Sequence, residues 1–210
     1  MDQNVILVET VPLEFDLESL GCRLRIRPGQ TKFMDRLSRL AEEAARVARP
    51  KAVARLCGLT ILDEEKVQVG EVTFSSPLLR QKMDGLGRAF PYLASEGTEL
   101  ADWSLSLSSS LEQVFASALR EVAVQQAENL LERTLLERYG IAQVSAMNPG
   151  SLKVWSLEEQ VPLFELLAPL PEKLGVTLLP SLMMRPEYSV SGVFFQTDSK
   201  FYNCQLCPTK

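Results

Sequence analysis

Two cysteines near the end of the chain have a spacing that suggests chemistry. Cys204 and Cys207 are separated by two residues, and two thiols at this spacing can chelate one metal ion or close a redox disulfide. A zinc site or an iron–sulfur cluster needs about four protein ligands, so Cys22 and Cys57, or a partner protein, would have to complete it. Three interpretations stay open: no cofactor, which we prefer, part of a zinc or iron–sulfur site, or a redox pair.

The other reactive side chains narrow the possible chemistry. Cys22 and Cys57 have apolar neighbours, which predicts buried free thiols. The chain contains no histidine, which excludes a Ser-His-Asp or Cys-His nucleophile and a histidine-ligated metal. Acid–base chemistry by this chain alone would therefore have to use Asp, Glu, Lys, Tyr or Cys.

Two glycines mark places where the backbone can approach a ligand. Pro149-Gly150 predicts a tight turn, because proline fixes one φ angle and glycine tolerates a positive φ. Gly192 lies inside an alternating segment, 189–195, where a glycine predicts a bulge or a close approach by another group. A plain turn and a packed strand are the competing interpretations, and each signal alone is weak.

The composition bounds the class of protein. The 210 residues are 46% hydrophobic and 23% charged, which is typical of a soluble globular domain. A net charge of −5 gives no support to nucleic-acid binding. No apolar run is long enough to cross a bilayer, and the first residues lack the basic flank of a signal peptide. We therefore expect a cytoplasmic protein.

The spacing of hydrophobic residues predicts both strands and helices along the chain. Strands are predicted near 4–8, 52–62, 66–74, 176–179 and 189–196, the third interrupted at 70–71. Helices are predicted at 31–48, 76–84 and 109–138, with a turn over 17–21 ended by Gly21 and a capping box formed by Ser156 and Glu159. Residues 90–94 remain ambiguous. The pattern predicts one α+β unit over 1–210, with an N-terminal half over about 1–145 and a C-terminal lobe over about 146–210.

The C-terminal motifs follow one another in a specific order. They are Pro149-Gly150, Glu165-Leu166-Leu167, Gly175 with Val176-Thr177-Leu178, Ser181-Leu182-Met183-Met184, Pro186, Ser189-Val190-Ser191-Gly192, Phe195, and Asp198-Ser199-Lys200-Phe201-Tyr202. In this order the chain resembles the reactivation domain of cobalamin-dependent methionine synthase. The N-terminal part resembles small free-standing relatives of that domain.

This resemblance implies a fold and a task. The fold would be a curved antiparallel sheet with helices. The task would be to cap a corrinoid on a partner, a corrinoid-binding protein or methyltransferase, while oxidised cobalt is rescued. A flavodoxin or ferredoxin would supply the electron and S-adenosylmethionine the methyl group. The resemblance places the S-adenosylmethionine site at Pro149, Gly150, Lys200, Phe201 and Tyr202.

The chain departs from the family's ligand loop at two positions. The family has an arginine three positions before the proline-glycine pair and a tyrosine directly after it, where this chain has Ala146 and Ser151. Alanine cannot form the bidentate contact of an arginine with a ligand carboxylate, so Lys153 or Lys200 would have to supply a substitute cation.

Two functions therefore stay open. One is an accessory or reactivation protein of a corrinoid-dependent methyltransferase system, with methyl transfer only together with its partner. The other is a non-catalytic scaffold that has lost the S-adenosylmethionine site. An independent methyltransferase of the doubly wound type is disfavoured, because the glycine-rich strand-to-helix loop is missing.

Overall fold

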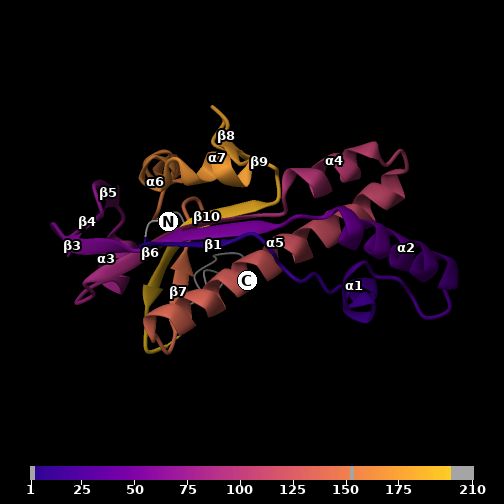
Figure 1. The fold of residues 1–210 in the computed structure, drawn as a ribbon, viewed down its shortest axis with the longest axis horizontal. Coiled ribbons are helices and arrows are strands. Elements are labelled where there is room, and N and C mark those ends of the chain that lie inside the picture. Colours follow the sequence, from indigo (N-terminus) through magenta and orange to yellow (C-terminus); the bar gives the residue numbers. More distant parts are fainter. Residues whose placement is uncertain (1–2, 152–153, 200–210) are drawn as a thin grey trace.

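The computed structural model describes residues 3–151 and 154–199 (Figure 1). The helices are α1 (Leu17–Arg23), α2 (Thr31–Val47), α3 (Pro77–Lys82), α4 (Thr98–Ser106), α5 (Ser110–Tyr139), the 3-10 helix η1 (Leu157–Glu159), α6 (Gln160–Leu167) and α7 (Leu170–Leu174). The strands are β1 (Val5–Val8), β2 (Lys51–Arg55), β3 (Cys57–Ile61), β4 (Lys66–Val69), β5 (Val72–Ser75), β6 (Arg88–Ser95), β7 (Val144–Met147), β8 (Thr177–Leu178), β9 (Met184–Arg185) and β10 (Ser189–Gln196).

The main sheet is built around β6. One edge of β6 pairs with β2 and then with β3, and the other edge pairs with β10. β1 continues the sheet beyond β2, the β4–β5 hairpin continues it beyond β3, and β7 lies outside β10. All of these pairs are antiparallel, which confirms the predicted α+β class with an antiparallel sheet.

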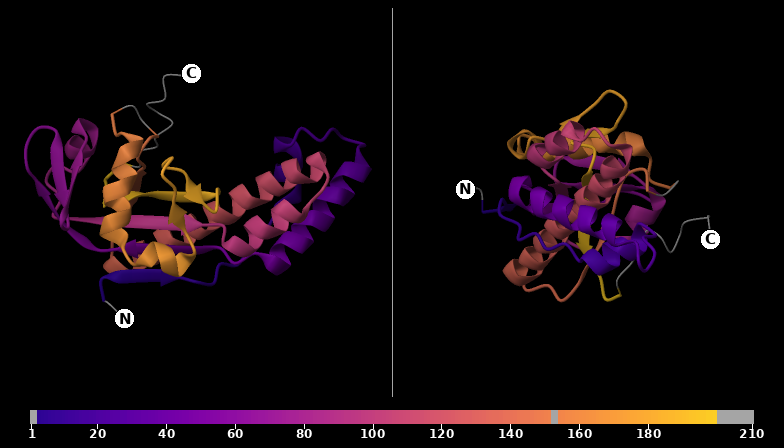
Figure 2. Two further views of the ribbon diagram at one scale, coloured as in Figure 1. Left: turned by 90° about the horizontal axis from the view of Figure 1, so that it is seen from above. Right: turned by 90° about the vertical axis from the view of Figure 1, so that its right-hand side faces the viewer.

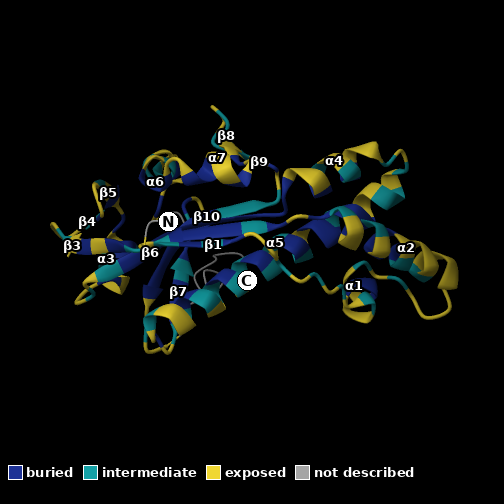
Figure 3. Cartoon of the chain, viewed as in Figure 1, coloured by how far each residue is buried: buried dark blue, intermediate teal, exposed yellow. Residues whose placement is uncertain are grey.

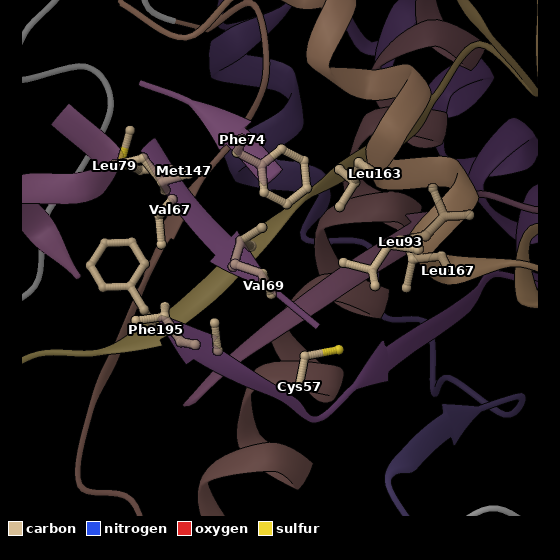
Figure 4. Close-up of a cluster of buried hydrophobic side chains, with 14 of the residues drawn as sticks. Cys57, Val67, Val69, Phe74, Leu79, Leu93, Met147, Leu163, Leu167 and Phe195 are labelled. Carbon is tan, nitrogen blue, oxygen red and sulfur yellow. The ribbon is translucent and has the colours of Figure 1, made fainter. Parts of the chain in front are cut away.

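Side chains alternate between two cores on the two faces of this sheet. Phe90, Tyr92 and Ala94 of β6 face α5, whereas Leu93 of the same strand faces α6 and α7. Figure 4 shows the second core, where Leu93 lies with side chains of α6 and of the β4–β5 hairpin. Figure 1 shows the sheet between α5 on one side and α6 with α7 on the other.

The long helix α5 joins the sheet to a separate helical core. Apolar side chains in its first half pack with α1, α2 and α4, which gather at one end of the molecule (Figure 2). Side chains in its second half pack on the sheet. The helix ends at Gly140, whose φ of 60° gives a left-handed cap. Figure 3 shows the central strands largely buried and the outer turns of α2 and α4 exposed.

Several predicted elements differ from the structure in detail. The predicted strand 52–62 is divided into β2 and β3, and the ambiguous residues 90–94 belong to the central strand β6. The predicted turn over 17–21 does not end at Gly21 but continues to Arg23. A Cβ at Gly21 would lie 2.9 Å from Met34 Sδ, so this glycine serves close packing of α1 on α2. Helix α4 was not predicted.

The predicted capping box at Ser156 and Glu159 is wrong. The Ser156 hydroxyl accepts a hydrogen bond from Glu158 N at 3.3 Å. The Glu159 carboxylate instead accepts one from Ser75 N at 3.2 Å, because the end of β5 lies beside this turn. In place of one helix that begins at a capping box, the short 3-10 helix η1 comes first and α6 follows it.

The two described cysteines differ in environment. Cys57 is a buried free thiol, as predicted, and burial raises its pKa. Cys22 is an exposed free thiol, so its predicted burial is wrong: Leu20 and Gly21 form the buried face of α1. None of the helices in the described ranges has the length and apolarity to cross a membrane.

We expect Gly97→Ala to destabilise the fold strongly. Gly97 joins β6 to α4 with a φ of 87° and a ψ of 152°, a conformation that almost only glycine adopts. A Cβ there would lie 2.4 Å from the carbonyl oxygen of Arg49. Backbone strain and this clash should together lower the free energy of unfolding by about 3 kcal/mol or more, measured by urea denaturation.

Gly29→Ala is the matched control. Gly29 has a φ of 88°, but a Cβ added there would have no atom within 4 Å, so only strain of about 1–2 kcal/mol is expected. Equal losses in the two variants would contradict the steric argument.

Candidate functional site

The loop after β7 is anchored to the sheet by Asn148. Its side-chain Nδ2 donates to Tyr92 Oη at 2.8 Å and to the carbonyl oxygen of Ser191 at 2.9 Å. A Cβ at Gly192 would lie 2.4 Å from Met147 O and 2.6 Å from Asn148 Nδ2. The group that approaches Gly192 is therefore the end of β7 and the start of this loop.

The same hydrogen-bond chain reaches α5. Tyr92 Oη donates to Glu128 Oε1 at 2.6 Å, and its ring stacks on Phe194 with centroids 3.9 Å apart. Burial, followed by the charge and hydrogen bond of Glu128, holds the pKa of Tyr92 well above its usual value. The phenol therefore stays protonated and acts as a donor, not as a base.

Sequence reasoning missed Tyr92 and Glu128. The available signal was a tyrosine among apolar residues in a central segment, because a buried phenol needs a hydrogen-bond partner. The identity of that partner depends on the packing of α5.

Pro149 and Gly150, the described members of the predicted ligand site, lie in this anchored loop. Pro149 is buried and Gly150 is exposed. Gly150 has a φ of 79°, and a Cβ there would lie 2.8 Å from Leu157 Cδ1. Its N–H donates to the carbonyl oxygen of Trp155 at 2.9 Å, and the buried Trp155 ring packs edge-on against Phe74 at 5.7 Å between centroids. The loop is thus held at Asn148 by the sheet and at Gly150 by the hydrogen bond to Trp155.

Ala146 faces the α5 side of the sheet. It pairs with Phe194 in β10 and packs against the core that contains Phe194 and Tyr92. Glu128 and Glu132 of α5 both contribute to the raised pKa of Tyr92 on this face. An arginine at position 146 would therefore enter this face, where the chain has alanine.

One cavity lies along another side of α5, lined by Gln126, Asn129 and Arg133. It has a volume of about 740 Å³ and lies between residues 11–16 and α5. Gln126 pins the facing segment, because its Oε1 accepts from Glu14 N at 3.1 Å and its Nε2 donates to Glu14 O. The volume of this cavity lies in the range of small-molecule sites.

The remaining predicted site residues are not tested. Lys200, Phe201, Tyr202, Cys204 and Cys207 lie outside the described residues, as does Lys153. Within 3–151 and 154–199, no group of three or more His, Cys, Asp or Glu side chains is placed to hold a metal ion. The zinc, iron–sulfur and redox interpretations therefore remain predictions.

We expect Tyr92→Phe to lower the free energy of unfolding by about 1–3 kcal/mol, because Glu128 and Asn148 lose a buried partner while the ring stacking is kept. Urea denaturation measures this loss. Tyr139→Phe is the control: its buried Oη has no hydrogen-bond partner among the described residues, so its removal should change stability by less than about 0.5 kcal/mol. Similar losses in both variants would rule out the hydrogen-bond chain as the cause.

Comparison with known proteins supports the fold. No protein-family model matches the chain, and no curated protein matches it. Among solved structures, the MetH reactivation domain bound to AdoHcy is similar with a TM-score of 0.64 and 17% sequence identity. The likeness covers 94% of this chain and 80% of that chain. The chain therefore has the fold of the MetH reactivation domain.

Proposed function

We propose that this chain is an accessory protein of a corrinoid-dependent methyltransferase system. It would dock on a corrinoid-binding protein or methyltransferase and assist its reductive, S-adenosylmethionine-linked reactivation. The observation that carries this proposal is the structural likeness, over 94% of the chain, to a reactivation domain bound to AdoHcy. The ordered motifs from Asn148 to Tyr202 support it independently.

The resemblance implies a reaction in two steps at the corrinoid of the partner protein. A flavodoxin or ferredoxin would supply one electron to the partner's corrinoid, and S-adenosylmethionine would supply the methyl group and leave as S-adenosylhomocysteine. The residues of this chain would bind and orient the ligand. The exposed backbone at Gly150 would permit a ligand to approach closely.

One observation favours the second function, a scaffold without a ligand. Ala146 and Ser151 stand where the family has an arginine and a tyrosine. Without the arginine, a ligand carboxylate loses a charge-assisted bidentate contact, which contributes about 1.5–3 kcal/mol. The two functions thus differ in whether the chain binds S-adenosyl compounds.

We expect the chain to bind S-adenosylhomocysteine, and Ala146→Arg to strengthen this binding by about tenfold or more, because the variant restores the missing cation. Calorimetric titration measures the dissociation constant. The fluorescence of Trp155, whose carbonyl accepts from Gly150 N–H, is the second readout.

Ala142→Arg is the matched control, because residue 142 is exposed and precedes β7. It adds the same charge outside the site and should leave the dissociation constant unchanged. Absence of binding by both the natural chain and Ala146→Arg would refute the ligand-linked role and favour the scaffold. Equal strengthening in both arginine variants would show a general charge effect instead.

A further inference from the structure

A second cavity lies beside the start of β10, away from the Pro149–Gly150 loop. It has a volume of about 350 Å³ and is lined by residues of α4 and α5, by Gly175 after α7, and by residues 185–187. The loop contacts β10 at Ser191 and Gly192 instead. The volume of this second cavity is sufficient for a small metabolite.

Arg120 presents its guanidinium to this cavity in a fixed orientation. Its Nε and Nη2 donate to the two carboxylate oxygens of Glu96 at 2.6 and 2.7 Å. Its Cζ lies 4.5 Å from the centre of the Tyr188 ring, and its side chain is 9% exposed. Burial lowers the pKa of Arg120, but the hydrogen bonds and charge of Glu96 outweigh this effect and raise it, so the group stays charged.

The third nitrogen of this guanidinium is available to a ligand. Within the described part of the chain, Nη1 makes no hydrogen bond and forms only a long ion pair with Glu187 Oε2 at 3.7 Å. The Glu187 side chain is 73% exposed, so it can turn toward solvent. A charged donor held in place and largely desolvated binds an acceptor with little reorganisation.

The charges around the cavity are of both signs. Arg185 adds a second cation, and Asp102 and Glu187 add two carboxylates. A simple anion would be attracted by Arg120 and Arg185 and repelled by the acids, whereas a zwitterion satisfies both. Leu105 also lines the cavity, although it is 79% exposed, and supplies an apolar contact surface.

We propose that this cavity is a second ligand site, which binds a free α-amino acid with an apolar side chain. The carboxylate would accept from Arg120 Nη1 and pair with Arg185, and the ammonium group would lie near Asp102. This inference does not depend on the proposed reactivation function.

The test is a nuclear magnetic resonance titration of the full chain with L-leucine up to about 50 mM, a range that detects millimolar affinity. We expect saturable shifts of the Arg120 Nε–H signal and of the Ala101 and Gly175 amides. L-Leucinamide, which lacks the carboxylate, and 4-methylpentanoate, which lacks the ammonium group, should each bind at least about tenfold more weakly.

Variants locate the site. Arg185→Ala and Asp102→Asn change exposed side chains and should each weaken leucine binding by about tenfold. Lys173→Ala removes an exposed cation of α7 that does not line the cavity and should have no effect. The proposal is overturned if leucine gives no saturable shift, if leucinamide binds equally well, or if Lys173→Ala weakens binding as much as Arg185→Ala. Loss of S-adenosylhomocysteine binding by the loop would leave the leucine result unchanged.

Discussion

The position of α5 on the sheet depends on two polar contacts with β6. Tyr92 bonds to Glu128, and Glu96, at the end of the strand, bonds to Arg120. Four strand residues span about 13 Å, and eight helical residues span about 12 Å, so the two spacings match and place both helix residues on one face. A slip of α5 by one residue would leave a buried phenol and a buried carboxylate without partners, which is costly. These contacts therefore fix the register in which the apolar side chains of α5 cover the sheet.

The strand that carries these contacts must itself be paired on both edges. All of β6 after Arg88 is buried, and buried backbone groups require partners. Pro91, which cannot donate, lies where pairing passes from β2 to β3, since Tyr92 pairs with Ala54 and Ala89 with Cys57. The break between those strands thus lets a central strand contain a proline.

The two candidate ligand sites lie near these two contacts. Tyr92 and Glu128 support the loop after β7, and Arg120, held by Glu96, lines the smaller cavity. In each site a buried residue, Tyr92 in β6 or Glu96 directly after it, contacts a side chain of α5. A rigid supporting scaffold of this kind suits ligand recognition, because positioned groups need little reorganisation on binding. The fold likeness directs attention to the first site, and the charges of the second cavity are a separate property of this chain.

Local signals in the sequence determined much of the secondary structure. The alternation over 189–196 defined β10, and the helical spacing of apolar residues over 109–138 defined α5 to within a residue. The motif order also gave the fold class and the position of the Pro149–Gly150 loop. Only the tertiary structure identified β6 as the central strand, because Pro91 obscures its pattern, and only it paired Tyr92 with Glu128 and Glu96 with Arg120. Those partners are 36 and 24 residues apart, and no local pattern encodes a contact that forms only when a helix packs across a strand.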